Sequence, residues 1–197
     1  EEPCTDPGMY LPNRYPHATY AAMVTHIDKQ VGDLVQKLKD LGIWENTIFI
    51  VTSDNGPASN GNSPMEYFRS GGPFKCGKGW GKSSLHEGGI RMPFVLRWGE
   101  GKQCEKTQHI SSFADIMPTL AEIVGVEAPE NDGVSFAPTV LSQTAGGQQY
   151  SHASGIKAGE QKEHEYLYWE FPGSKGWVAV RMGEWKGIVR KVLKGNT

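Results

Sequence analysis

The stretch "IFIVTSDNGP", residues Ile48–Pro57, decides the expected fold of this chain. It begins in an apolar run, Thr47–Thr52, that stops at an acid, an amide and a glycine. The run is β-branched and aromatic without alternation, which predicts a strand covered on both faces, as in a parallel sheet with flanking helices. Because sites in open α/β sheets gather at the carboxyl ends of strands, Asp54 and Asn55 stand where a site is expected.

The sequence on either side of this strand predicts an α/β domain. Upstream, apolar residues over Tyr20–Leu41 recur every three or four positions, which predicts an amphipathic helix. Downstream, residues 55–92 are rich in Gly, Ser, Asn and Pro, and an aperiodic stretch of this length is more often functional than not. A second apolar run, Pro93–Trp98, follows it, and then a helix is expected over Asp115–Val124 with its first residue as N-cap.

The end of the chain predicts a small antiparallel sheet. The segment 142–163 is polar and small, and its stretch "QTAGGQQ" is predicted to be mobile. We therefore expect an α/β domain over 1–140 and a small C-terminal subdomain over 141–197. Three β-like runs follow this segment, at 165–171, 177–182 and 184–192, with a hairpin turn at Gly183-Glu184.

Composition excludes several classes of protein. The 197 residues carry a formal net charge of −2, which gives no basic excess to attract nucleic acid or an anionic membrane. No apolar run approaches the roughly 20 residues that cross a bilayer. The cysteines, Cys4, Cys76 and Cys104, are too widely spaced for a zinc pattern and leave their disulfide state open.

The triplet Asp54-Asn55-Gly56 is the first candidate site. Asp54 and Asn55 both present oxygen donors, which suit a hard cation such as Ca²⁺ or Mg²⁺. Gly56 allows the backbone to turn away sharply. From the triplet alone, an Asx-turn that merely ends the strand is the competing interpretation.

The second candidate is "CGKGWGKSSLHEGGIRMP", residues 76–93. It approaches a P-loop, but a cysteine stands at the first glycine position and the strand and helix that a P-loop needs are not indicated, which argues against nucleotide binding. Lys82, in a glycine-rich loop, could instead anchor an anionic oxygen of a sulfate or phosphate ester; the alternative is a solvated lysine. Arg91 could also reach an anion, but we expect it to pair with Glu87.

Taken together, these stretches resemble the C-terminal half of a type I, arylsulfatase-like sulfatase. The resemblance implies an alkaline-phosphatase-like α/β fold with flanking helices and a small C-terminal antiparallel sheet. It implies a sulfuric ester hydrolase acting on a sulfated carbohydrate or an aryl sulfate. The stretches that carry it, in order, are "YAAMVTHIDKQVGDLVQKLKDLGIWENTIFIVTSDNGP", "GKGWGKSSLHEGGIRMPFVLRW", "SSFADIMPTLAEIVGV", "DGVSFAP" and "WVAVRMGEWKGIV".

The resemblance also implies roles for single residues. Asp54 and Asn55 would help to bind Ca²⁺, with Mg²⁺ as the alternative, and Lys82 would be the catalytic lysine that contacts the sulfate. His86 falls in the same loop and is a candidate to face the substrate. Related phosphatases carry histidine at the position of Asn55, because imidazole suits zinc, so the amide favours an oxygen-bound ion.

Some parts of such an enzyme are not found in the sequence. The family's nucleophile is a formylglycine made within a C/S-x-P-S/A-R motif, which occurs nowhere in this chain. We therefore expect a fragment that is inactive alone, whose partner is the missing N-terminal half with the formylglycine, and which works in the periplasm or elsewhere outside the cytoplasm. The alternatives are a phosphoryl-transfer member of the same superfamily and a non-catalytic anion-binding module.

Aromatic and histidine residues elsewhere give weaker signals. The aromatic residues of the tail could form a sugar-stacking wall, but a hydrophobic core for the small sheet is favoured. His109, His152 and His164 give no functional signal. The aromatic residues in question are Trp169, Phe171, Trp177 and Trp185.

Overall fold

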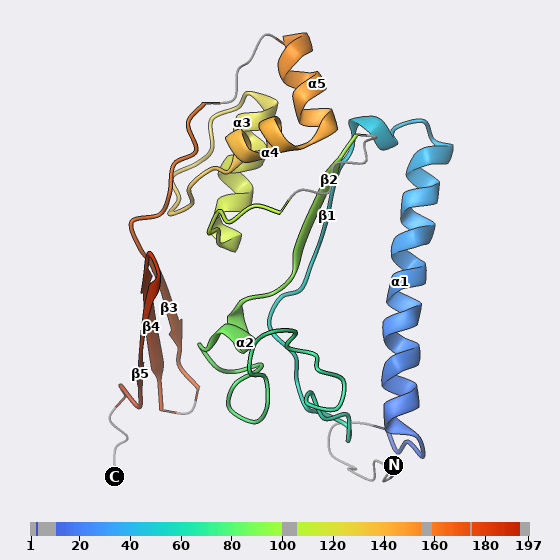
Figure 1. Ribbon diagram of the computed structural model, residues 1–197, viewed down its shortest axis with the longest axis vertical. Coiled ribbons are helices and arrows are strands. Elements are labelled where there is room, and N and C mark those ends of the chain that lie inside the picture. Colours follow the sequence, from blue (N-terminus) through green and yellow to red (C-terminus); the bar gives the residue numbers. More distant parts are fainter. Residues whose placement is uncertain (1–2, 4–10, 100–105, 155–158, 174, 194–197) are drawn as a thin grey trace.

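The computed structural model of the chain describes residues 3, 11–99, 106–154, 159–173 and 175–193, and it confirms the α/β class (Figure 1). Cys4 and Cys104 lie outside the described residues. The helices are α1 (Pro16–Asp40), η1 (Trp44–Asn46), α2 (Glu87–Ile90), η2 (Phe113–Asp115), α3 (Ile116–Val124), α4 (Ala137–Gln143) and α5 (Ala145–Ser154). The strands are β1 (Ile48–Thr52), β2 (Phe94–Trp98), β3 (Leu167–Phe171), β4 (Trp177–Met182) and β5 (Trp185–Arg190).

The expected strand forms, but its surroundings differ from the prediction. β1 pairs antiparallel with β2 alone among the described strands, with Ile48 opposite Trp98 and Thr52 opposite Phe94. It is half-buried over its first three residues and exposed over its last two. The prediction of a parallel sheet covered on both faces is therefore wrong for the described residues. An unbroken apolar run indicates faces that can be buried, but it does not indicate the direction of the partner strand.

One hydrophobic core lies where β1 and β2 meet α3, α4 and α5. Trp98, at the end of β2, packs there, and Tyr150 from α5 lies 5.6 Å from its ring. Figure 1 shows these helices gathered at one end of the strand pair. This core fixes the end of the β1–β2 pair that is opposite to Asp54. Its buried members are Trp98, Ile123, Phe136, Ala137, Val140 and Leu141.

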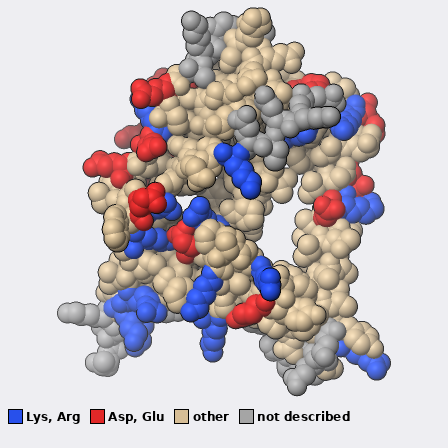
Figure 2. All heavy atoms as spheres, viewed as in Figure 1, with Lys and Arg blue, Asp and Glu red and all other residues tan. Residues whose placement is uncertain are grey.

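Helix α1 confirms the amphipathic pattern and begins earlier than predicted, at Pro16. Its apolar stripe has little cover among the described residues: Val24, Ile27 and Leu34 are each more than half exposed. Figure 2 shows an open gap between this helix and the rest of the molecule. The described contacts hold α1 near its ends, through the Ser63 hydroxyl on the Pro16 carbonyl and through η1.

The small C-terminal sheet is confirmed, with the antiparallel order β3-β4-β5 and a hairpin at Gly183-Glu184. Trp177 packs in a second core with Leu85 from the long loop, and Trp169 and Phe171 pack against that core. The core interpretation of the tail aromatics therefore holds for these three. It fails for Trp185, which is 84% exposed.

The segment "QTAGGQQ" is largely helical, and its mobility stays a prediction. α4 and α5 cover most of it, and the Thr144 hydroxyl accepts a hydrogen bond from the Gly147 N–H at the start of α5. Gly146 lies so close to Trp98 that a Cβ would come within 2.5 Å of the ring. Glycine allows close packing here. The composition of a segment does not show whether its glycines serve close packing or flexibility. The expected domain boundary at residue 140 falls within α4 and stays a prediction.

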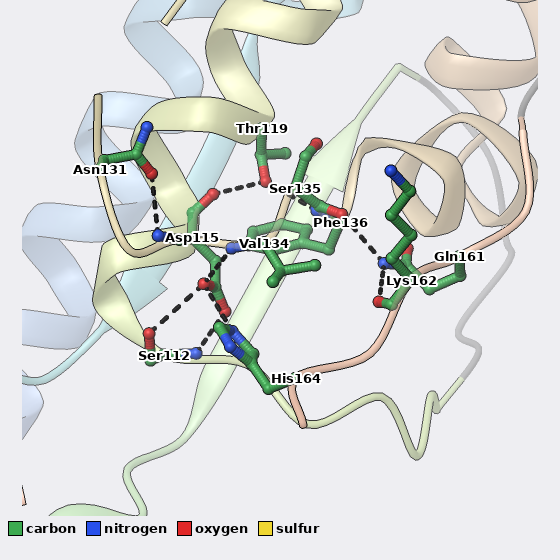
Figure 3. A network of polar contacts seen from close by, with 11 residues as sticks. Ser112, Asp115, Thr119, Asn131, Val134, Ser135, Phe136, Gln161, Lys162 and His164 are labelled. Atoms are coloured by element: carbon green, nitrogen blue, oxygen red, sulfur yellow. Dashed lines mark hydrogen bonds and ion pairs between the residues drawn. The ribbon is translucent and has the colours of Figure 1, made fainter. Parts of the chain in front are cut away.

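Asp115 stands at the N-cap position of α3, as predicted, but its side chain does not cap that helix. α3 has no side-chain cap, and the Asp115 carboxylate instead forms a capping box with Ser112 around η2 (Figure 3). The same carboxylate accepts hydrogen bonds from the Val134 N–H at 2.8 Å and lies 2.8 Å from His164 Nε2. It therefore joins three segments that are far apart in the sequence, and His164, which gave no signal, is one of its partners.

Thr119 extends this network. Its hydroxyl donates to the Asp115 carbonyl at 2.6 Å and accepts from the Phe136 N–H at 2.9 Å. Both side chains are almost fully buried, and their polar atoms have partners, as buried polar groups require.

We expect Asp115→Ala to lower the free energy of unfolding by about 1–3 kcal/mol, because it leaves part-buried donors without their acceptor. Urea denaturation of the purified protein measures this change. The matched control is Asp132→Ala, since Asp132 is exposed in the connector next to Val134. Equal unfolding midpoints for the two variants would show that the carboxylate contributes no stability.

Candidate functional site

The long loop between β1 and β2 brings two of the predicted site residues to one cavity. Asn55 and Lys82 both line a cavity of about 820 Å³, together with Tyr20 of α1 and Arg91. Asn55 is half-buried and the Lys82 side chain is exposed. A residue with an amide side chain and a residue with an ammonium group therefore line the same cavity.

Asp54 begins the turn that carries Asn55. It is exposed and is not among the described residues that line the cavity. Its Oδ1 accepts the Asn55 N–H at 2.9 Å, and Asn55 Nδ2 donates to the Gly56 carbonyl at 3.0 Å. These bonds join adjacent residues, whereas an Asx-turn would join the side chain to the N–H two residues on. Asp54 Oδ2 and Asn55 Oδ1 are not used in them.

The oxygen atoms at this turn are of the kind that bind a hard cation. Carboxylate and amide oxygens are ligands that Ca²⁺ prefers, and Ca²⁺ takes about six to eight oxygens. The described part of the chain contains no group of three or more His, Cys, Asp or Glu that could hold a metal ion. Asp54 and Asn55 would therefore supply two oxygens, and the remaining ligands would come from other groups.

Gly56 lies against helix α2. Its N–H donates to the Gly89 carbonyl at 2.8 Å, and a Cβ at Gly56 would overlap the Gly88 carbonyl. Gly56 is also buried. The turn after β1 can approach α2 this closely only because the residue has no side chain.

Lys82 is held by its backbone. Its N–H donates to the Pro57 carbonyl at 2.8 Å, and a Cβ at the preceding Gly81 would come within 2.5 Å of the same carbonyl. The loop therefore lies directly on the turn that carries Asn55. This contact places the Lys82 and Asn55 side chains around the same space.

Glu87, the first residue of α2, is the centre of a cluster of charged side chains. Its carboxylate pairs with Arg91 at 3.3 Å, with Lys186 at 2.7 Å and with Arg181 at 3.8 Å. Burial raises the pKa of Glu87, but the hydrogen bond and charge of Lys186, followed by those of Arg91, outweigh it and leave the pKa below its usual value. The expected Arg91–Glu87 pair is confirmed, and we call these four residues the Glu87 cluster.

The two partners from β4 and β5 could not be predicted from the local sequence. Lys186 is 99 positions from Glu87. No spacing rule connects residues so far apart, and each would pass for an ordinary surface cation on a strand. In Figure 2, basic side chains gather over the region where Figure 1 places the β3–β5 sheet.

His86 is not among the described residues that line the cavity of Asn55 and Lys82. Its ring stacks on Trp80 at 4.0 Å and meets the edge of Trp177 at 5.7 Å. Burial, and then the charges of Arg190, Lys186 and Lys75, lower its pKa, so the imidazole is neutral at neutral pH. A substrate role for His86 stays a prediction, to which this geometry adds no support.

A second, smaller cavity of about 230 Å³ lies beside α2 and shares Arg91 and Met92 with the first. His109 lines it, and its buried Nε2 has no hydrogen-bond partner among the described residues. Burial lowers the pKa of His109 more than the nearby carboxylates raise it. No feature of the sequence marked this histidine.

In the part of the chain that the structure describes, no helix combines the length and apolar character needed to cross a membrane.

Comparison with known proteins gives a consistent result. The family model described as Sulfatase matches residues 3–126. Human arylsulfatase A is 29% identical over 184 residues, which cover 91% of this chain and 32% of that protein. The N-acetylgalactosamine-6-O-sulfatase of Bacteroides thetaiotaomicron is 26% identical over 196 residues, covering 89% of this chain and 34% of that protein. The chain thus spans about a third of the length of these relatives.

Solved structures agree with the sequence relatives. The crystal structure of Ps i-CgsB matches with a TM-score of 0.57 and 25% identity, over 92% of this chain and 35% of that one. Another match of the same quality is Ps i-CgsB in complex with k-i-k-neocarrahexaose. The alkaline-phosphatase-like α/β class expected from the resemblance is confirmed.

We expect Gly56→Ala to cost about 3 kcal/mol of folding stability, at the upper end for overpacking, because the added methyl overlaps the backbone of α2. The control is Gly32→Ala in α1, where a Cβ meets nothing within 4 Å. That variant should be more stable by about 0.4–1 kcal/mol, since alanine reduces the entropy of the unfolded chain. Thermal denaturation of both variants measures these changes. A Gly56→Ala protein as stable as the wild type would contradict the close contact.

Proposed function

The chain belongs to the sulfatase family, and on that premise we propose that it forms the C-terminal part of an enzyme that hydrolyses sulfate esters. It spans about a third of its relatives, so the activity proposed is that of a longer protein. The observation that carries the proposal is the shared cavity of Asn55 and Lys82. The Asn55 side chain can bind a metal cation, and the Lys82 ammonium group is itself a cation. Both can therefore bring positive charge to one anionic group.

Lys82 is the proposed catalytic residue of this chain. A sulfate ester carries one negative charge on its sulfuryl oxygens, and further charge develops on the leaving oxygen as its bond to sulfur breaks. An ammonium group fixed near those oxygens stabilises the charge without reorganising at the moment of reaction. The backbone hydrogen bond from Lys82 to Pro57 holds the residue at the cavity.

Asp54 and Asn55 are the proposed ligands of a calcium ion, with magnesium as the alternative. When bound, the cation adds positive charge against the sulfuryl oxygens. The oxygen donors of these two residues support a hard ion rather than zinc. The formylglycine nucleophile would come from the N-terminal part of the longer protein.

Helix α1 supports the existence of such a partner region. An amphipathic helix in a globular protein buries its apolar stripe, and the stripe of α1 is largely exposed in this chain. The proposed cover is the N-terminal half of the same enzyme. Its place of action would be the periplasm or another compartment outside the cytoplasm.

The substrate class is proposed from the relatives. Names such as N-acetylgalactosamine-6-sulfatase, and a structural match in complex with an oligosaccharide, favour a sulfated carbohydrate over a simple aryl sulfate. Two other functions compete: phosphoryl transfer within the same superfamily, and a non-catalytic module that binds an anion. Asn55 argues against the first, because a zinc site would favour imidazole.

We expect Lys82→Ala in the full-length enzyme to lower kcat on an aryl sulfate by about 10²-fold or more, as for loss of one donor to the developing charge. Steady-state kinetics measure the effect. Lys78→Ala is the matched control, since Lys78 is exposed in the same loop and is not among the described cavity residues. Equal rates for the two variants would remove Lys82 from the site.

Metal analysis of the purified full-length protein should find calcium, and Asp54→Ala should weaken its binding by removing a charged oxygen ligand. Asp40→Ala is the control, because Asp40 is an exposed residue at the end of α1. Stoichiometric zinc in the wild-type protein would support the phosphoryl-transfer alternative, and calcium binding unaffected by Asp54→Ala would remove Asp54 from the metal site.

A further inference from the structure

We propose that Glu87, held by Lys186 and Arg181 of the C-terminal sheet, is a positioning residue that sets the distance between Lys82 and Asn55. The inference rests on the proposed function, since it concerns the same cavity. It assigns the β3–β5 sheet a part in catalysis, although Lys186 and Arg181 do not line the cavity of about 820 Å³.

Helix α2 connects the two sides of the cavity. On one side, its Gly89 carbonyl accepts the N–H of Gly56, the neighbour of Asn55. On the other side, Gly88 and Gly89 lie so close to the loop that carries Lys82 that a Cβ at either would overlap backbone carbonyls there. A displacement of α2 therefore moves both the turn of Asn55 and the loop of Lys82.

Glu87 ties this helix to the C-terminal sheet. Lys186 Nζ lies 2.7 Å from Glu87 Oε1, and Arg181 Nη1 lies 3.8 Å from Oε2. The two cationic side chains are only 14% and 20% exposed, so solvent and salt screen these pairs less than an ordinary surface pair. Lys186 also lies over the ring of Trp169, at 5.1 Å from its centre, which fixes the ammonium group further.

Apolar packing supports the same connection. Leu85, two residues before Glu87, is buried in one core with Trp177 and Ala179 of β4. His86 lies between Leu85 and Glu87 in the sequence, and its ring packs against Trp80 and Trp177. The segment before α2 is therefore fixed to the face of the β3–β5 sheet. The ion pairs of Glu87 fix the position of α2 itself relative to the same sheet.

The expected consequence is kinetic. A catalytic donor displaced by about 1 Å can cost as much as 10²-fold in rate, even when the change is remote from the reacting atoms. Loss of the Lys186 contact should shift α2, and with it Lys82 and Asn55, although the substitution replaces no residue that lines the cavity. Arginine at the same position keeps the charge and can reach the carboxylate.

The test compares Lys186→Met, Lys186→Arg and the control Lys191→Met in the full-length enzyme with an aryl sulfate as substrate. We expect Lys186→Met to lower kcat about tenfold with a smaller change in KM, because positioning acts on the transition state. Lys186→Arg should keep most of the rate. Lys191 is exposed beyond the end of β5 and outside the Glu87 cluster, so Lys191→Met should behave as wild type.

A double-mutant cycle with Lys82→Ala distinguishes positioning from a general structural role. If Lys186 acts through Lys82, Lys186→Met should lower the rate of the Lys82→Ala enzyme by much less than tenfold, since effects of coupled residues do not add. Rates are taken per folded molecule, well below the unfolding temperature. An equal fold-change in both backgrounds, or a loss of thermal stability with unchanged kcat, overturns the inference.

Hydrogen exchange tests the contact without any turnover. Amides of residues 76–90 should exchange faster in Lys186→Met than in Lys186→Arg or Lys191→Met, because the cluster restrains that segment. Unchanged exchange overturns the inference whatever the enzyme's substrate. If the wild-type protein has no sulfatase activity but the variants show this exchange pattern, the proposed function is contradicted. The positioning role of Glu87 would then still stand.

Discussion

The close approach of two backbone segments is the constraint on which the site depends. The turn after β1 and helix α2 meet through the Gly56 N–H and the Gly89 carbonyl, with no side chain between them. Because this contact is between main chains, it fixes distance more tightly than contacts between flexible side chains would. Asn55 and Lys82 take their positions around the cavity from the segments on either side of it.

The two hydrophobic cores act on opposite ends of this contact. The core of Trp98 and Phe136 holds the far end of the β1–β2 pair, and the core of Trp177 and Leu85 holds the loop that leads to α2. Asp115 joins the connectors around the first core, and Glu87 joins α2 to the second. A carboxylate with several donors, fully buried at Asp115 and partly exposed at Glu87, thus connects distant segments in both halves of the structure.

The sequence predicted local features better than distant ones. The helix over Tyr20–Leu41 and the strand that ends before Asp54 follow from periodicity and β-branching, and both are observed. The direction of the β1–β2 pairing depends on residues far along the chain, which no window of sequence contains. The same holds for the partners that Asp115 and Glu87 find in other segments. The glycines of "QTAGGQQ" suggested a mobile segment, but Gly146 of α5 packs closely against Trp98.

The distance in sequence between Glu87 and Lys186 has a consequence for biosynthesis. The ribosome delivers a chain from its N-terminus, at roughly 5–20 residues per second, and a contact across 99 positions cannot form until the later residue has emerged. During that interval Glu87 can pair with Arg91, four residues away, but not with Lys186. The link between α2 and the C-terminal sheet is therefore formed late in translation.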